Sequence, residues 1–271
     1  MYNDVVDLRE FYESSLGQVV RRLVRRRLRE LWPDVGGQRV LGIGYATPFL
    51  RPFLTEAERV MAVMPAAQGV VFWPPEGPGL VALGEESELP FSNMSVDRVL
   101  LVHGLEFTEH LKPMMQEIWR VLAGGGRLIA VVPNRRGIWA RTDRTPFGHG
   151  SPFSTGQLRR VLRANLFVPE RETSALFMPP VKSRFFMASA GAVENLGARW
   201  FKAFAGVQIV EASKQIYATT ATRVVEPRRR LAPSVAQPAF SGLAAERRLL
   251  PRLVASSGAP GAGVLDPDTK P

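Results

Sequence analysis

Short apolar segments alternate with polar connections over residues 38–132, and this alternation restricts the chain to a small set of folds. The segments predict strands at 38–43, 59–63, 80–83, 96–102 and 126–132, with a helix at 111–122 between the last two. Strands that alternate with helices or connecting segments form βαβ units, so we predict an α/β protein with a doubly wound, mostly parallel sheet. Ligands of such sheets bind outside the carboxyl ends of the strands.

The flanking segments divide the chain into three parts. Residues 5–32 have apolar side chains at steps of three and four with arginines between them, which predicts one amphipathic helix in an N-terminal part, residues 1–37. Residues 38–222 form the sheet domain, with further helices expected at 155–164 and 190–204 and strands near 172–177 and at 207–217. Residues 223–271 are rich in Pro, Ala, Gly and Arg without an apolar period, which is typical of a disordered basic tail.

The amino-acid composition excludes several kinds of site. The chain has no Cys, which excludes disulfides, thiolate metal sites and Cys nucleophiles, and three His are too few for a His-rich metal cage. The apolar runs are too short for a membrane span, and the first residues lack the basic region of a signal peptide. We therefore expect a cytoplasmic protein.

The net charge of +10 suggests an anionic partner, and the basic residues are clustered. Residues 21–29 contain six Arg on the predicted helix, residues 135–144 contain four, and residues 223–271 carry a net charge of +4. The helix could follow the phosphates of a nucleic acid or an anionic membrane surface. A solvated helix face is the alternative that we favour, so nucleic-acid binding stays a secondary hypothesis.

The turn after the first strand has the residues of a ligand-facing loop. Gly42 and Gly44 let the backbone approach a ligand closely, and Thr47 with Pro48 suits the N-cap and first position of a helix. The alternative is that any tight turn from strand to helix uses glycine. The dinucleotide fingerprint G-x-G-x-x-G is incomplete because Thr47 takes the place of the third glycine, which argues against a nicotinamide enzyme.

Four sequence blocks resemble the class I S-adenosylmethionine-dependent methyltransferases, especially the type 11 group. They are RVLGIGYAT, GEESELPF followed by SVDRVLLVHGLE, EIWRVLAGGGRLIAVVPN, and GHGSPFSTGQL, and the similarity extends over roughly residues 39–157. The resemblance implies a Rossmann-like methyltransferase sheet of seven strands, mostly parallel, with an antiparallel last strand supplied by residues 207–217. It also implies S-adenosylmethionine as the cofactor and methyl transfer as the activity.

Two positions depart from the pattern of this family. The acid that ends the first strand in the family corresponds to Gly42, and Met64 or a neighbour occupies the place of the acid that ends the second strand and holds the ribose. A thioether cannot accept two hydroxyl protons as a carboxylate does, and a charge-assisted hydrogen bond contributes about 1.5–3 kcal/mol. The sequence therefore predicts weakened or lost cofactor binding.

The resemblance assigns Gly42, Gly44 and Tyr45 to the cofactor cleft. Glu85, with Glu86 beside it, falls where family members often have the Asp that contacts the adenine amino group. A solvated acidic loop is an equally good interpretation of these glutamates, because runs of like charge are usually solvated.

His103 follows the fourth strand, which in this family lies beneath the transferring methyl group. With Glu106, Glu109 and His110 close behind it, His103 is suited to orient a nucleophile or to take its proton as a general base. The alternative is that these polar side chains only flank the start of a helix and have no role in catalysis. We predict His103 as a catalytic residue and expect no metal site, because softer or more numerous ligands are absent from the sequence.

Asp97 and the glycines at 124–126 are predicted to be structural. Asp97 precedes an apolar strand and is expected to cap or pair near its start. The three glycines are expected to end the preceding helix in a left-handed cap and to begin the fifth strand.

The segment after the fifth strand is the predicted substrate-binding loop. Arginines suit phosphate or carboxylate recognition, and aromatic neighbours allow stacking, so we assign the loop to an anionic acceptor. The assigned residues are Arg135, Arg136, Trp139, Arg141 and His149. A surface loop whose arginines pair locally or stay solvated is at least as good an interpretation.

Three functions are consistent with the sequence. The first is S-adenosylmethionine-dependent methyl transfer to an unidentified acceptor. The second is a catalytically inactive methyltransferase-like binding or scaffold protein, which the missing acids favour. The third is a nucleic-acid-binding protein, which the arginine clusters favour.

Overall fold

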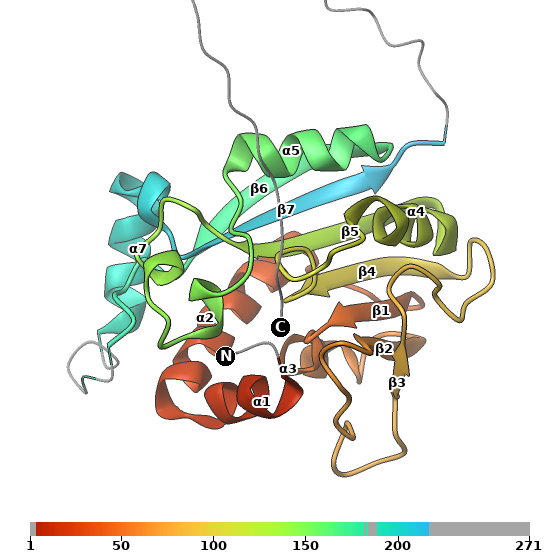
Figure 1. Ribbon diagram of the computed structural model, residues 1–271, viewed down its shortest axis with the longest axis horizontal. Coiled ribbons are helices and arrows are strands. Elements are labelled where there is room, and N and C mark those ends of the chain that lie inside the picture. The colour runs from red at the N-terminus through yellow and green to blue at the C-terminus, as the bar shows by residue number, and fades with distance from the viewer. Residues whose placement is uncertain (1–3, 182, 184–188, 217–271) are drawn as a thin grey trace, which may run out of the picture. The chain divides into compact units, whose positions relative to one another are not determined.

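A seven-stranded sheet runs through the residues that the structure, a computed structural model, describes: 4–181, 183 and 189–216 (Figure 1). Its strands are β1 (Arg39–Gly44), β2 (Arg59–Pro65), β3 (Val81–Gly84), β4 (Val96–Val102), β5 (Leu122–Pro133), β6 (Phe167–Ala175) and β7 (Val207–Lys214). Strands β1 to β5 are parallel, and β7 runs antiparallel to both of its neighbours, β5 and β6. The predicted doubly wound, mostly parallel sheet is confirmed.

The spatial order of the strands is β3-β2-β1-β4-β5-β7-β6. β1 therefore pairs with both β2 and β4, and Gly44 lies opposite Val102 at the carboxyl ends of β1 and β4. The chain turns toward opposite edges of the sheet from this point, which makes it the topological switch point where ligands of such sheets bind. The last strand in the sequence is β7, and it is antiparallel as predicted. The strand at this edge of the sheet is β6, which pairs with β7.

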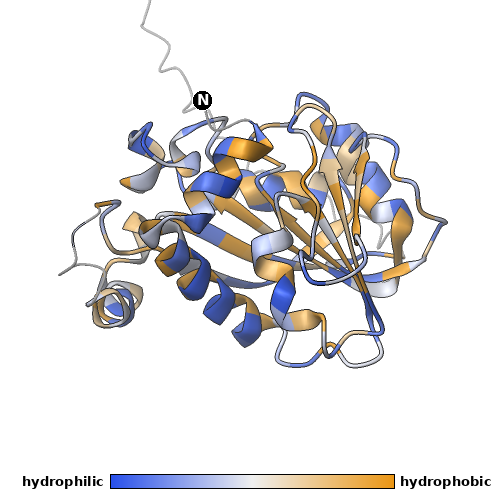
Figure 2. Cartoon of the chain, turned by 90° about the horizontal axis from the view of Figure 1, so that it is seen from below, coloured by the Kyte–Doolittle hydropathy of each residue, from blue (hydrophilic) through white to orange (hydrophobic). Residues whose placement is uncertain are grey.

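Helices cover both faces of the sheet. They are α1 (Val5–Glu13), α2 (Ser15–Leu31), α3 (Thr47–Leu50), α4 (Leu111–Val121), α5 (Thr155–Ala164) and α7 (Ala190–Trp200), with 3-10 helices η1 (Arg51–Phe53), η2 (Trp139–Arg141), η3 (Pro146–Gly148) and η4 (Lys202–Phe204). Buried side chains of α1, α2 and α3 share one apolar core with the sheet, and those of α4 and α5 share the core on the opposite face. Figure 2 shows mostly hydrophobic strands beneath helices that have one hydrophobic and one hydrophilic side. The predicted tail, residues 223–271, lies outside the described residues.

The prediction of a single helix over residues 5–32 is wrong, because the chain turns at Ser14. The Ser14 backbone is extended (ψ 158°), and its N–H donates to the carbonyl oxygens of Glu10 and Phe11. Its side-chain hydroxyl accepts a hydrogen bond from the Gly17 N–H at 3.1 Å. One serine therefore ends α1 and begins α2, so residues 5–31 form two helices instead of one.

The arginines of α2 are partly engaged within the chain. The apolar side of this helix is buried on the sheet, and its buried apolar side chains are Leu16, Val19, Val20, Leu23, Val24, Leu28 and Leu31. On the other side, Arg25 donates to the Pro48 carbonyl oxygen at 2.7 Å, and Arg29 pairs with Glu56 at 2.8 Å. The basic face that suggested a polyanionic partner thus ties α2 to the segment after β1.

Three predicted element boundaries are corrected. The N-cap of α3 is Ala46 rather than Thr47, and α3 is only four residues long. Helix α4 ends at Val121 with an extended residue behind it, and the glycines at 124–126 lie within β5, where they form an irregularity opposite Asp97 instead of a left-handed cap. The helix predicted over 190–204 ends at Trp200, and η4 follows it.

Asp97 links the start of β1 to β4, as predicted for a structural acid. Its carboxylate accepts hydrogen bonds from the Arg39 backbone N–H at 2.9 Å and from the guanidinium Nε and Nη2 at 2.9 and 3.0 Å. These hydrogen bonds from Arg39 are the main cause that lowers the pKa of Asp97 below its ordinary value.

Replacing Asp97→Asn should lower the free energy of unfolding by about 1–2 kcal/mol at neutral pH, because the pair is charge-assisted but partly exposed. Asp97 has a lowered pKa in the folded state, so its contribution is present above the unfolded pKa and is lost as the pH falls through the folded pKa. Urea unfolding at successively lower pH should therefore show a shrinking difference between the two proteins. A difference that is the same at every pH would contradict this assignment.

Candidate functional site

The carboxyl ends of β1 and β4 approach each other closely. Gly44 has a positive φ of 76°, and a Cβ at this position would sit 2.3 Å from the Val102 carbonyl oxygen. Gly42 lies beneath α3, where a Cβ would sit 2.6 Å from Leu50 Cδ1. Both glycines are therefore required by the packing of the chain itself.

His103 directly follows β4 and adopts a backbone conformation that is uncommon for residues other than glycine (φ 51°). Its Nε2 atom lies 2.7 Å from the Tyr12 hydroxyl oxygen, and its Nδ1 atom lies 3.0 Å from Glu106 Oε1. All three side chains are buried. They form a continuous Tyr–His–Glu chain at the topological switch point.

The neighbours of the His103 imidazole determine which nitrogen is basic. Burial raises the pKa of Tyr12 well above its ordinary value, and the nearby Tyr45 and Glu106 raise it further, so the phenol keeps its proton. The hydrogen-bond network is satisfied when the Tyr12 hydroxyl donates to Nε2 and the Nδ1–H group donates to Glu106. In this assignment Nε2 is the basic nitrogen, and it faces α1.

Two buried oxygen atoms beside His103 have no hydrogen-bond partner among the described residues. They are Glu106 Oε2 and Gln68 Oε1. The Gln68 amide donates through Nε2 to the His103 carbonyl oxygen at 2.5 Å, which places it at the same edge. An unpaired buried acceptor costs about 1–3 kcal/mol, so these oxygens are available to hydroxyl or ammonium donors of a ligand or of water.

Helix α1 covers this edge of the sheet. The Tyr12 ring stacks on the Tyr45 ring with 5.7 Å between centroids, and the Val5 N–H donates to the Gln68 carbonyl oxygen at 2.8 Å. Tyr45, Gln68 and His103 are buried as a result. Both ends of α1 thus contact the site.

The structure brings together only some of the predicted cofactor residues. Gly42, Gly44 and Tyr45 lie at the carboxyl end of β1, next to His103. Glu85 and Glu86 follow β3, which is two strands away from β1, and Glu85 is exposed. The assignment of these two glutamates to the adenine group stays a prediction.

Sequence reasoning missed Tyr12 and Gln68. Tyr12 belongs to a Phe-Tyr pair on the apolar side of an amphipathic helix, a pattern typical of core residues. Met64 is buried in the last part of β2 and has no oxygen, whereas Gln68, four residues later, presents an amide at this edge. A search for polar side chains shortly after the second strand would have found Gln68.

Comparisons with known proteins agree with this architecture. Residues 41–130 match the family described as a methyltransferase domain. Over 125 residues the chain is 26% identical to the ubiquinone/menaquinone biosynthesis C-methyltransferase UbiE of Rubrivivax gelatinosus, an alignment that covers 45% of this chain and 50% of that protein. The chain thus matches about half the length of this relative.

Solved structures of S-adenosylmethionine-dependent methyltransferases share the fold. One from Thermotoga maritima is 19% identical, with 78% of this chain and 96% of that chain covered and a TM-score of 0.55. One from Mesorhizobium loti is 12% identical, with 74% and 99% covered and a TM-score of 0.50. The chain thus shares the fold of these methyltransferases, and residues 41–130 are similar to a methyltransferase domain.

The predicted substrate loop is corrected at one residue. Trp139 is fully buried and donates its Nε1–H to the Met178 carbonyl oxygen at 2.7 Å, so its ring belongs to the core and is closed to a substrate. Arg135, Arg136 and Arg141 are exposed, and His149 is half-buried with Nε2 3.0 Å from the Asp143 carbonyl oxygen. The loop therefore presents its arginines without the predicted stacking partner.

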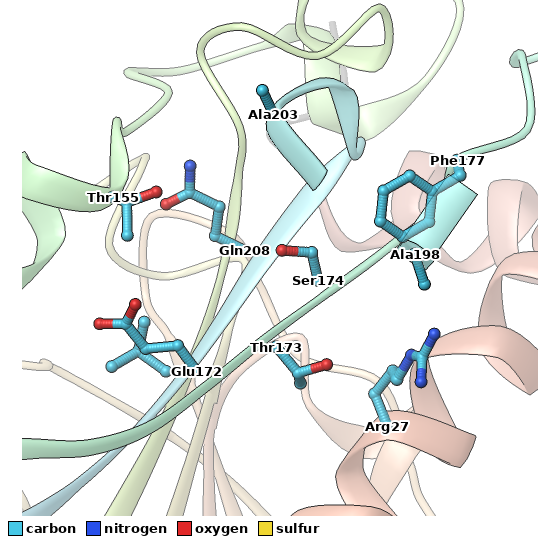
Figure 3. Close-up of a pocket in the computed structure, with 10 residues that line it drawn as sticks. Arg27, Thr155, Glu172, Thr173, Ser174, Phe177, Ala198, Ala203 and Gln208 are labelled. Atoms are coloured by element: carbon cyan, nitrogen blue, oxygen red, sulfur yellow. The ribbon is translucent and has the colours of Figure 1, made fainter. Parts of the chain in front are cut away.

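Two cavities of the described structure lie away from His103. One of about 600 Å³ lies among α2, β6, β7 and α7, and Figure 3 shows the side chains that line it, including Arg27, Glu172, Phe177 and Gln208. The other, of about 420 Å³, lies at the amino ends of β1 and β4. Neither is lined by a residue predicted to bind cofactor or substrate.

The described part of the chain has neither a metal-binding cluster nor a membrane-spanning helix. No cluster of three His, Asp or Glu side chains within it is placed to hold a metal ion. No helix within it combines the length and the apolar character needed to cross a bilayer.

Replacing Gly44→Ala should lower the free energy of unfolding by about 3 kcal/mol or more, because the new Cβ meets a backbone oxygen and the positive φ is strained. Gly156→Ala in α5 is the matched control, since a Cβ there meets open space, and it should change stability by no more than about +1 kcal/mol. Chemical unfolding of both variants measures the difference. Equal stability of the two variants would contradict the close approach of β1 to β4.

Proposed function

We propose that this chain transfers a methyl group from S-adenosylmethionine, with the cofactor at the carboxyl ends of β1 and β2 and the acceptor beside His103. The observation that carries the proposal is the buried Tyr12–His103–Glu106 chain at the topological switch point. The unpartnered oxygens of Gln68 and Glu106 add acceptors for the donor groups of a ligand at the same place.

The residues present fit the cofactor, but they offer it fewer polar contacts than the family pattern does. S-adenosylmethionine, when bound, supplies a methyl group on a sulfonium sulfur. The backbone at Gly44 and Tyr45 would face it, and Gln68 Oε1 is the acceptor suited to a ribose hydroxyl or an ammonium group, which Met64 cannot bind. A neutral amide replaces a carboxylate here, so we expect weaker binding than an acid at position 64 would give.

His103 supplies the base in this proposal. Glu106 holds the Nδ1–H group, and Nε2 takes the proton of the Tyr12 hydroxyl as that hydroxyl receives the proton released by the acceptor atom. Helix α1 covers the edge and excludes water from the reacting atoms. Because sulfonium methyl transfer depends mainly on alignment, positioning by Tyr12 and Glu106 contributes as much as basicity.

We further propose an acceptor that carries a carboxylate or phosphate group. Arg135, Arg136 and Arg141 are exposed on the loop that leaves the carboxyl end of β5, beside β4. Planar guanidinium groups bind such anions through paired hydrogen bonds.

A second candidate function is a binding or scaffold protein that does not transfer methyl groups. Two observations favour it: Met64 replaces the acid of the second strand, and α1 buries Tyr45 and His103. Under this alternative the Tyr12–His103–Glu106 chain would be a structural element of the core.

Calorimetric titration with S-adenosylmethionine and S-adenosylhomocysteine distinguishes the two functions. We expect measurable binding of both, and Gln68→Ala should weaken it about tenfold, the loss of one buried hydrogen bond to the ligand. The matched control is Gln18→Ala on the exposed side of α2, which should leave the affinity unchanged.

The result of this titration distinguishes the methyltransferase from the binding or scaffold protein. Absence of heat and of any thermal shift at millimolar ligand would remove the methyltransferase proposal and leave the binding protein. Binding that is equally strong in the Gln68 and Gln18 variants would remove Gln68 from the site.

A further inference from the structure

Exposed apolar side chains gather at the end of α7 and in η4. The exposed fractions are 59% for Leu196, 68% for Trp200, 56% for Phe201 and 59% for Phe204. All four lie within nine residues of the sequence, between β6 and β7. Single exposed apolar residues are ordinary, but a group of three aromatic rings is typical of an interaction surface.

The same segment carries positive charge without an outward-facing acid. Residues 189–206 contain the basic residues Arg199 and Lys202, and their one acidic residue is Glu194. Glu194 is buried, and its carboxylate accepts hydrogen bonds from the backbone N–H groups of Leu176 and Phe177 at 3.0 and 2.9 Å. Its charge is therefore directed inward, where it anchors α7.

Other basic side chains lie near α7, although Arg26 and Arg27 of α2 are paired with Glu30 at 3.4 and 3.0 Å. The Arg199 guanidinium lies 5.8 Å from the centre of the Trp200 ring. Helix α2 packs against α7, and its Arg26 and Arg27 lie close enough to Glu194 to oppose the rise in pKa that burial causes. In Figure 1, α7 stands at the end of the sheet where β6 ends and β7 begins.

We propose that α7 and η4 dock on a membrane surface that carries anionic lipid headgroups. Trp200, Phe201 and Phe204 insert at the level of the headgroups and upper acyl chains, and Arg199 pairs with lipid phosphates or carboxylates. Aromatic rings combined with basic and without acidic side chains are the composition of interfacial segments, whereas a protein partner is usually met by charges of both signs at the rim. This surface is independent of the proposed methyl transfer.

Vesicle cosedimentation of the full chain tests the proposal. Vesicles of phosphatidylcholine mixed with phosphatidylserine should bind the protein, and those of phosphatidylcholine alone should bind it more weakly. Combined replacement of Trp200, Phe201 and Phe204 by serine should weaken binding at least about tenfold, since three large apolar side chains leave the bilayer. Phe72→Ser is the matched control, because Phe72 is 67% exposed outside the surface and its replacement should have no effect.

The serine variant also separates docking from plain charge attraction. It keeps every basic residue, including those of residues 223–271, so binding that survives in this variant would overturn the proposal. A different result would overturn the proposal in favour of a second copy of the chain as the occupant. In that case the wild type binds no vesicles but forms a concentration-dependent dimer on gel filtration, and the serine variant does not form this dimer. Circular dichroism should show an unchanged fold, because the three side chains are exposed.

Quenching of tryptophan fluorescence by brominated lipid locates the contact. Trp200 is exposed, whereas Trp32, Trp73, Trp119 and Trp139 are buried or half-buried. Trp200→Phe should keep vesicle binding and lose most of the quenching. Quenching that is undiminished in this variant would place the membrane contact elsewhere and contradict the proposal.

Discussion

A buried imidazole at the carboxyl end of β4 connects three segments that are far apart in the sequence. His103 bonds to Tyr12 of α1 through Nε2, to Glu106 through Nδ1, and to the Gln68 amide through its carbonyl oxygen. Each of these groups is buried, so removal of one partner leaves another polar group unpaired at a cost of about 1–3 kcal/mol. This arrangement links α1 to the switch point, in addition to the apolar core that α1 shares with the sheet.

The site is therefore more enclosed and less acidic than the resemblance implied. Met64 offers no oxygen, and the glycines of the first turn serve the packing of β1 against β4 and α3. The acceptors at this edge belong instead to Gln68 and Glu106, which the sequence places after the second and fourth strands. In the proposed function, chemistry at this edge rests on positioning, on one neutral amide and on the Glu106-held imidazole.

Much of the fold could be predicted from the sequence, because its signals are local. Helix α5 was predicted at its observed bounds, and a capping box between Ser154 and Gln157 fixes its start. The buried strands appear as apolar runs, and Asp97 pairs at the start of β4 as expected. The helix break at Ser14 was missed because a serine in the middle of an apolar period does not by itself reveal which backbone groups it caps.

The site was harder to predict, because it depends on contacts between distant segments. Tyr12 and His103 are 91 residues apart, and the sequence of α1 gives only a core-like aromatic. Trp139 illustrates the opposite error: beside four arginines it suggested stacking with a substrate, yet its indole N–H satisfies the Met178 carbonyl in the core. Local composition cannot distinguish a ring at a pocket mouth from one beneath it.

Hydrogen exchange of the full chain with and without S-adenosylhomocysteine tests the central claim most directly, that the edge beneath α1 is the ligand-binding site. The expected result is slower exchange in residues 5–13, 44–47 and 103–106, with β6 and β7 unchanged, because a ligand there would bridge the segments that His103 connects. Unchanged exchange at saturating ligand, or protection at the cavity among α2, β6, β7 and α7 instead, would contradict this claim.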